Sequence, residues 1–64
     1  MSIKVMTTVI QFEDYLTMEE SHASMEEALT RYAERHKDFT VLFEKHLDKN
    51  ELVIKTLSLQ EHIN

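Results

Sequence analysis

The 64-residue chain contains no cysteine, no glycine, no proline and no tryptophan. Without cysteine no disulfide can form, and a zinc ion would have only histidine and carboxylate ligands. Without glycine there is no glycine-rich loop to bind a phosphate. A single domain of this size buries little surface, so we expect self-association or a partner protein to stabilise it.

Long apolar runs are also missing from the sequence. No segment approaches the about 20 apolar residues that a membrane-spanning helix needs. The N-terminal residues MSIKVMTTVI lack the charged region, apolar core and cleavage site of a signal peptide. We therefore expect a cytoplasmic protein that does not enter a membrane.

Positive charge is scarce, and the negative charge is concentrated in the N-terminal part of the chain. Residues 1–27 contain six acids and one base, a net charge of -5, whereas residues 28–64 contain six of each and are neutral. The N-terminal part is poorly suited to nucleic acid, because phosphate contacts need lysine and arginine. It would suit a partner with a basic surface; the alternative is a solvated acidic face that maintains solubility.

The clearest predicted element is a helix over Ser24–Asp38, SMEEALTRYAERHKD. Ser24 and Glu27 have the spacing of a capping box, and acids precede bases along the segment, as the helix dipole favours. One buried stripe is predicted, because these residues recur at helical spacing: Met25, Ala28, Leu29, Tyr32 and His36. The sequence does not define the C-terminal end of this helix, because helical spacing continues through Phe39, Phe43 and Leu47.

Two strands are predicted before this helix. Ile3–Phe12 is rich in β-branched residues and favours a strand over the alternative, a helix. Val9 and Ile10 are both apolar, which indicates a central strand covered on both faces, or a bulge. Tyr15–Ala23 is predicted as a second, acidic strand at the sheet edge, with an irregular loop as the alternative.

A hairpin is one prediction for the C-terminal part. Phe39–Leu47 fits a strand or a helix, Glu51–Leu59 has strand composition, and a frayed tail is expected from Gln60 onward. Asp48-Lys49-Asn50 is the best turn, because asparagine tolerates the left-handed conformation. A three-residue loop would produce these pairs: Phe39 with Leu59, and Val41 with Leu57.

The predicted fold class is therefore α+β. A small antiparallel sheet, in the order β-β-α-β and possibly with the C-terminal hairpin, packs on one helix in a single domain, residues 1–64. The absence of glycine and proline leaves an all-α protein as the alternative.

No combination of residues indicates catalysis or a cofactor. The four histidines are His22, His36, His46 and His62. No two of them have the spacing that places two metal ligands on one helical face, and the sequence has no HExxH motif. Glu44 and His46 are two apart and would share a face only on a strand. No serine lies in a glycine-flanked elbow. We therefore expect a non-enzymatic protein without metal or cofactor.

Within the predicted helix, Ala28-x-Thr30-x-Tyr32-Ala33-Glu34-x-x-Lys37 resembles the helix of the Dmd antitoxins of T-even phages. Beyond residues 28–37 the order of elements is similar, with strands before the helix and a strand after it. The resemblance implies a small phage-encoded protein that binds a host endoribonuclease toxin and blocks its activity. The matching positions have structural roles in the helix, so the resemblance assigns no binding residue.

Small size, one-sided acidity and the lack of catalytic sets predict a phage-type protein that binds and inhibits a host protein with a basic surface. The partner would be a toxin ribonuclease or another nucleic-acid-binding protein in the host cytoplasm. The predicted binding residues are acids of residues 1–27 and one aromatic residue expected to be exposed: Glu13, Asp14, Tyr15, Glu19, Glu20, Glu26 and Glu27.

Two other functions are open. The chain could be a self-associating structural or assembly module that forms a homodimer through its sheet edges or through Phe39–Leu47. It could also bind nucleic acid through the bases of its neutral part: Arg31, Arg35, Lys37, Lys45, Lys49 and Lys55.

Overall fold

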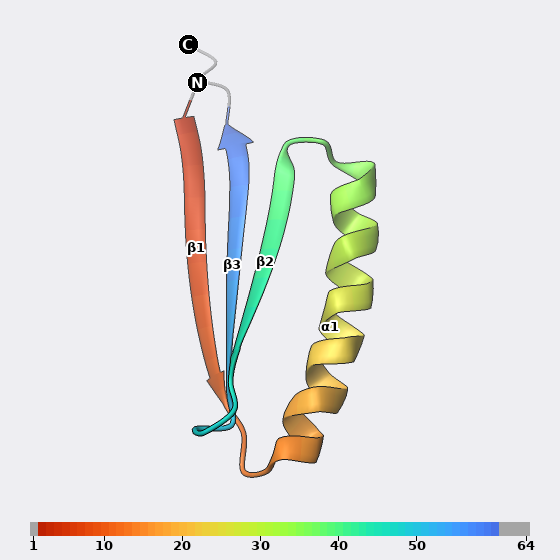
Figure 1. The fold of residues 1–64 in the computed structure, drawn as a ribbon. Helices are drawn as coiled ribbons and strands as arrows, with labels where there is room; N and C mark the ends of the chain where they lie inside the picture. Colours follow the sequence, from red (N-terminus) through yellow and green to blue (C-terminus); the bar gives the residue numbers. More distant parts are fainter. Residues whose placement is uncertain (1, 61–64) are drawn as a thin grey trace.

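The computed structural model describes residues 2–60, which form one helix and three strands in the order β1–α1–β2–β3 (Figure 1). The elements are β1 (Ser2–Gln11), α1 (Tyr15–Arg35), β2 (Phe39–His46) and β3 (Glu51–Gln60). The three strands form one antiparallel sheet with the helix against it. The prediction of an α+β fold is confirmed.

The sheet has β3 in its centre, flanked by β1 and β2. β1 pairs with β3 without interruption, from Ser2 opposite Gln60 to Gln11 opposite Glu51. The predictions of a central strand or a bulge at Val9 and Ile10 are therefore wrong, because β1 is a regular edge strand. Gln60 belongs to β3 and not to a tail, while residues 61–64 lie outside the described part.

The predicted C-terminal hairpin is present, with its register shifted by one residue. His46 pairs with Glu51, so the loop also contains Leu47, and Phe39 lies opposite Ser58 instead of Leu59. The Lys49 N–H donates to the His46 carbonyl at 3.1 Å. Asn50 has a φ of 50°, the left-handed conformation expected of it.

The helix begins nine residues before Ser24, at Tyr15, so the predicted acidic strand Tyr15–Ala23 is wrong. Asp14 is the N-cap: its backbone is extended, and its side chain accepts from the Thr17 N–H at 2.7 Å. Ser24 lies within the helix and caps nothing. The helix also ends earlier than predicted, at Arg35, and Phe39 begins β2.

Apolar residues from all four elements meet at the end of the sheet near the β1–α1 connection. Met18 and Leu52 are fully buried there, and Ile54 is nearly so. Around them pack half-buried residues from the helix, the strands and the β1–α1 connection: Ile10, Phe12, Met25, Leu29, Val41 and Phe43. Because side chains alternate along strands, this cluster identifies the face of the sheet that α1 covers.

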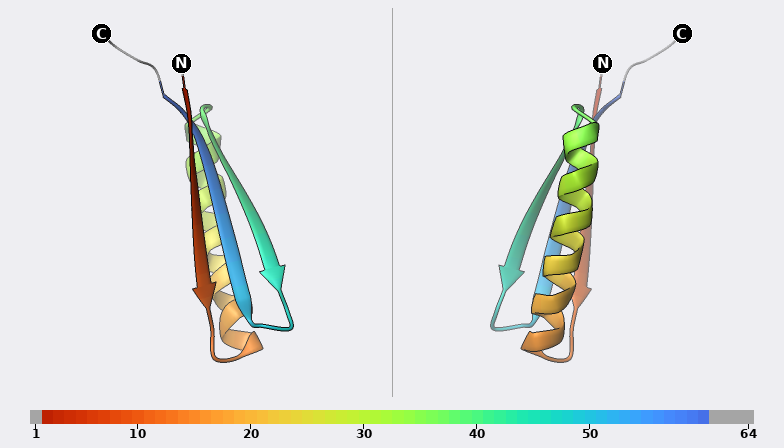
Figure 2. Two further views of the ribbon diagram at one scale, coloured as in Figure 1. Left: turned by 90° about the vertical axis from the view of Figure 1, so that its left-hand side faces the viewer. Right: turned by 90° about the vertical axis from the view of Figure 1, so that its right-hand side faces the viewer.

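The helix covers this face unevenly, because the sheet twists beneath it. Near its N-terminus α1 lies over the sheet, and near its C-terminus it lies beside β2 (Figures 1 and 2). The composition of β3 follows this divergence. Its helix-side residues are Leu52 and Ile54 where the helix is close, and Thr56 and Ser58 further along.

We predict that Met18→Ala lowers the free energy of unfolding by about 2–5 kcal/mol, because it leaves a cavity among Leu52 and Ile54. Leu16→Ala is the matched control. Leu16 is 71% exposed, so its loss should change the free energy by no more than about 0.5 kcal/mol. Urea denaturation followed by circular dichroism measures both, and equal losses would contradict this position of the core.

Candidate functional site

The structure divides the seven predicted binding residues among three environments. Glu13 and Asp14 precede the helix, and the other five lie on α1. On a helix of 3.6 residues per turn, Tyr15, Glu19 and Glu26 fall along the flank nearer β2, whereas Glu20 and Glu27 fall on the side away from the sheet. The seven residues therefore do not form one continuous acidic patch.

The acids on the flank of α1 are engaged within the chain. The Lys45 Nζ lies 2.7 Å from Glu19 Oε1, which raises the pKa of Lys45, with smaller contributions from the charges of Tyr15 and Glu26. The His22 Nε2 lies 3.2 Å from Glu26 Oε2, and the His22 ring packs edge-on against Phe43. These contacts fasten the helix to β2 and explain the flank acids without a partner.

Asp14 also has a structural role. The hydrogen bond that its carboxylate accepts from the Thr17 backbone N–H lowers the pKa of Asp14 from its ordinary value of 3.8. Tyr15 follows it as the first residue of α1 and is 48% exposed, as predicted. Glu13 is exposed in the connection between β1 and α1.

The side of α1 away from the sheet carries an exposed stripe, which we name the acidic ridge: Leu16, Glu20, Glu27 and Glu34. Steps of four and seven residues keep these positions on one helical face. Leu16 is the most exposed of the large apolar residues in the described chain. Glu27 accepts from the Arg31 guanidinium at 2.6 Å, whereas no ion pair involves Glu20 or Glu34 within residues 2–60.

Leu16 and Glu34 were not predicted as binding residues. The seven-residue spacing of Glu20, Glu27 and Glu34 was the available signal. This spacing does not indicate a helical face when the helix is predicted to start at Ser24, because Leu16 and Glu20 then lie in a strand.

A second candidate surface is the face of the sheet that α1 does not cover, which we name the open face. Strand alternation and the observed register place three sets of residues on it: Ile3, Val5, Thr7, Val9 and Gln11 of β1; Glu51, Val53, Lys55, Leu57 and Leu59 of β3; Thr40, Leu42, Glu44 and His46 of β2. Several large apolar side chains are exposed there: Ile3, Val5, Val9, Leu42 and Leu59. An apolar surface of this extent is typical of an interaction site.

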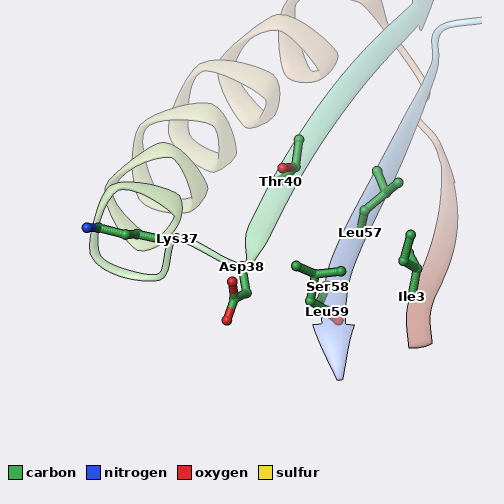
Figure 3. A pocket seen from close by; sticks show the side chains of 7 residues that line it. All are labelled: Ile3, Lys37, Asp38, Thr40, Leu57, Ser58 and Leu59. Atoms are coloured by element: carbon green, nitrogen blue, oxygen red, sulfur yellow. The ribbon is translucent and has the colours of Figure 1, made fainter. Parts of the chain in front are cut away.

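The open face is hollowed in two places. The hollow at the end nearer the chain termini has a volume of about 170 Å³, and Figure 3 shows Ile3 of β1 beside Leu57 and Leu59 of β3 at this hollow. A second hollow of about 320 Å³ lies further along the sheet, where Leu42, Val53 and Lys55 line it. Both hollows are shallow features of a surface and hold no cluster of reactive groups.

Among residues 2–60, no three histidine or carboxylate side chains come together as a metal site requires. Glu44 and His46 share a strand face, as their spacing predicted, with Oε2 and Nε2 3.2 Å apart. No helix in the described part of the chain is long and apolar enough to span a membrane.

Comparison of the chain with models of protein families, with curated proteins and with solved structures finds no match. The two surfaces must therefore be interpreted from their own geometry and charge.

We predict that Asp14→Ala lowers the melting temperature at neutral pH, because α1 loses its N-cap, while Asp14→Asn keeps most of the stability. The folded pKa of Asp14 is lowered, so its stabilisation is complete above 3.8 and is lost as the pH falls through the folded value. The deficit of Asp14→Ala relative to the natural chain should therefore shrink on acidification. Melting curves from neutral to strongly acidic pH measure this, and a deficit independent of pH would contradict it.

Proposed function

We propose that this protein is a non-enzymatic inhibitor that binds a larger protein through the acidic ridge of α1. The single observation that carries the proposal is the ridge itself: three glutamates and an exposed leucine on the side of the helix that makes no contribution to the core. A helix that presents spaced anchors on one exposed face is a common recognition element.

The charge of the ridge indicates the chemistry of the partner. Glu20 and Glu34 make no ion pair within the described residues, so both are available to lysine or arginine from another chain. Leu16 adds an apolar anchor at one end of the ridge, and a partner that covered it would remove water from around the charges and strengthen their attraction. A basic surface with an apolar pocket is the complementary shape.

A nucleic-acid-binding protein is the proposed class of partner, because its basic groove offers such a surface. The resemblance of residues 28–37 to the Dmd antitoxins supports a more specific target, a host endoribonuclease toxin, for a phage protein acting in the host cytoplasm. An acidic helix placed over an RNA-binding groove would inhibit the toxin by excluding the RNA.

We predict that Glu20→Lys weakens binding to a basic endoribonuclease toxin at least about tenfold, because it places like charges in contact. Asp48→Lys is the matched control, since it makes the same change in net charge in the β2–β3 loop, away from both surfaces. Binding is measured by calorimetry with a panel of purified toxins, in parallel with inhibition of RNA cleavage. The affinity of the natural chain should also fall with added salt.

Equal binding by the natural chain and Glu20→Lys would overturn the electrostatic role of the ridge. If the natural chain neither binds nor inhibits any toxin in the panel, that class of target is excluded.

A further inference from the structure

The apolar side of the sheet changes from one face to the other along the strands. Near the β1–α1 connection the helix side carries Ile10, Leu52 and Ile54, which α1 covers. In the other half of the sheet the helix side is mostly polar, and the apolar residues lie on the open face: Ile3, Val5, Leu57 and Leu59. Nothing in residues 2–60 covers this second apolar cluster.

Two runs of adjacent apolar residues in the strands also indicate that the open face needs to be covered by other apolar groups. Val9 and Ile10 are adjacent in β1, and Leu52, Val53 and Ile54 are consecutive in β3. Such runs are typical of strands that are buried on both faces. The helix covers Ile10, Leu52 and Ile54. On the open face, Val53 of the central strand is already buried at 8% exposed, whereas Val9 of the edge strand is exposed.

We propose that the open face is the interface of a homodimer, in which the sheets of two copies pack face to face. The arrangement would have four layers, with the two sheets inside and the two helices outside. Two sheets packed in this way lie about 10 Å apart and interdigitate their inner side chains. The hollows on the open face would receive side chains from the partner sheet. One lies at the ends of the strands, among Ile3 of β1, Thr40 of β2 and Leu57 of β3, beside the α1–β2 connection, and the other lies between β2 and β3.

The size of the open face approaches what such an interface needs. Two ten-residue strands and one eight-residue strand of about 3.3 Å per residue, about 4.8 Å apart, produce a flat footprint of about 440 Å². Two footprints total about 880 Å² before the relief of the side chains is added, and a specific interface needs about 1,000 Å². The dimer would therefore be at the smaller end of stable interfaces and would dissociate on dilution.

The charge of the open face favours a second copy over a charged partner. Its one lysine, Lys55, and two glutamates, Glu44 and Glu51, sum to a net charge of -1, although the whole chain carries -5. Groups of both signs on one apolar face can pair reciprocally across a two-fold axis. Among residues 2–60, the remaining acids are carried on α1 and on the loops, and all of them except Asp38, which lines one hollow, lie away from the open face.

The distribution of exposed side chains favours face packing over pairing of sheet edges. Among the described strands, only one exposed large apolar residue, Met6, lies on the helix side. Five lie on the open face: Ile3, Val5, Val9, Leu42 and Leu59. Pairing of two β1 edges would satisfy their backbone groups. It would also leave all five of these side chains in water, so the edges do not explain the composition of the face.

Sedimentation of the full chain over a range of concentrations tests the dimer. The natural chain should show a monomer–dimer equilibrium, and Val5→Lys should raise the dissociation constant at least about tenfold by placing an unpaired charge in the interface. Met6→Lys is the control on the same strand: Met6 is 54% exposed and Val5 is 59% exposed, on opposite faces. Circular dichroism verifies that each variant is folded.

A cross-linking experiment identifies the surface. Because the chain has no cysteine, Thr7→Cys and Thr8→Cys each introduce a single thiol, on the open face and the helix side of β1 respectively. A bis-maleimide that spans about 10 Å, the separation of packed sheets, should join two copies of Thr7→Cys but not of Thr8→Cys.

Three results would overturn the proposal. A natural chain that stays monomeric at the highest soluble concentration would assign the open face to another protein. Equal cross-linking of Thr7→Cys and Thr8→Cys would indicate pairing of β1 edges. Equal effects of Val5→Lys and Met6→Lys would show that the open face is not the interface. These experiments do not involve the acidic ridge, so their outcome is independent of the proposed inhibitory function.

Discussion

The structure depends on one packing contact, the burial of Met18 of α1 against Leu52 and Ile54 of β3. A single helix must cover a sheet of three strands. A 21-residue helix is about 32 Å long and matches the strands in length, but its diameter of about 10 Å spans only two of three strands set about 4.8 Å apart. The twist of the sheet then carries the far half out from under the helix. The buried core therefore lies in one half of the protein, and in the other half the helix does not cover the sheet.

This constraint explains where the polar residues lie. On β3, Thr56 and Ser58 occupy helix-side positions outside the buried cluster, and Ser58 lines a surface hollow with Tyr32 of α1. On α1, the flank acids are matched to β2, where Glu19 meets Lys45. Exposed ion pairs contribute little to stability, so the burial of Met18 determines which side of the helix faces the sheet, and the Glu19–Lys45 pair is compatible with that orientation.

The sequence was sufficient to predict the strands at the two ends of the chain and, as one alternative, the hairpin. It was not sufficient to predict the start of the helix, and it placed a strand at Tyr15–Ala23 where the helix begins. The capping box at Ser24 predicted a helix start there, whereas the structure uses Asp14 as the N-cap, a residue type that is equally suited to this position. The choice is made by packing, because only a helix that begins at Tyr15 places Met18 over Leu52. The hairpin register failed for a similar reason. A three-residue loop and a four-residue loop suit the same turn residues. Leu52, Val53 and Ile54 are all apolar, so they are compatible with either register.

The wrong start of the helix also explains why the predicted binding residues do not form one site. With Tyr15–Ala23 extended as a strand, all the acids of residues 1–27 form one surface, whereas the helix turns them in different directions and engages Glu19 and Glu26 within the chain. Val9 and Ile10 predicted a central strand covered on both faces, or a bulge, whereas β1 is a regular edge strand and α1 covers one face only. In the proposed dimer, a second copy of the sheet would cover the open face while both acidic ridges remained on the outer surface. Stabilisation and the proposed recognition would then use opposite sides of the same two layers.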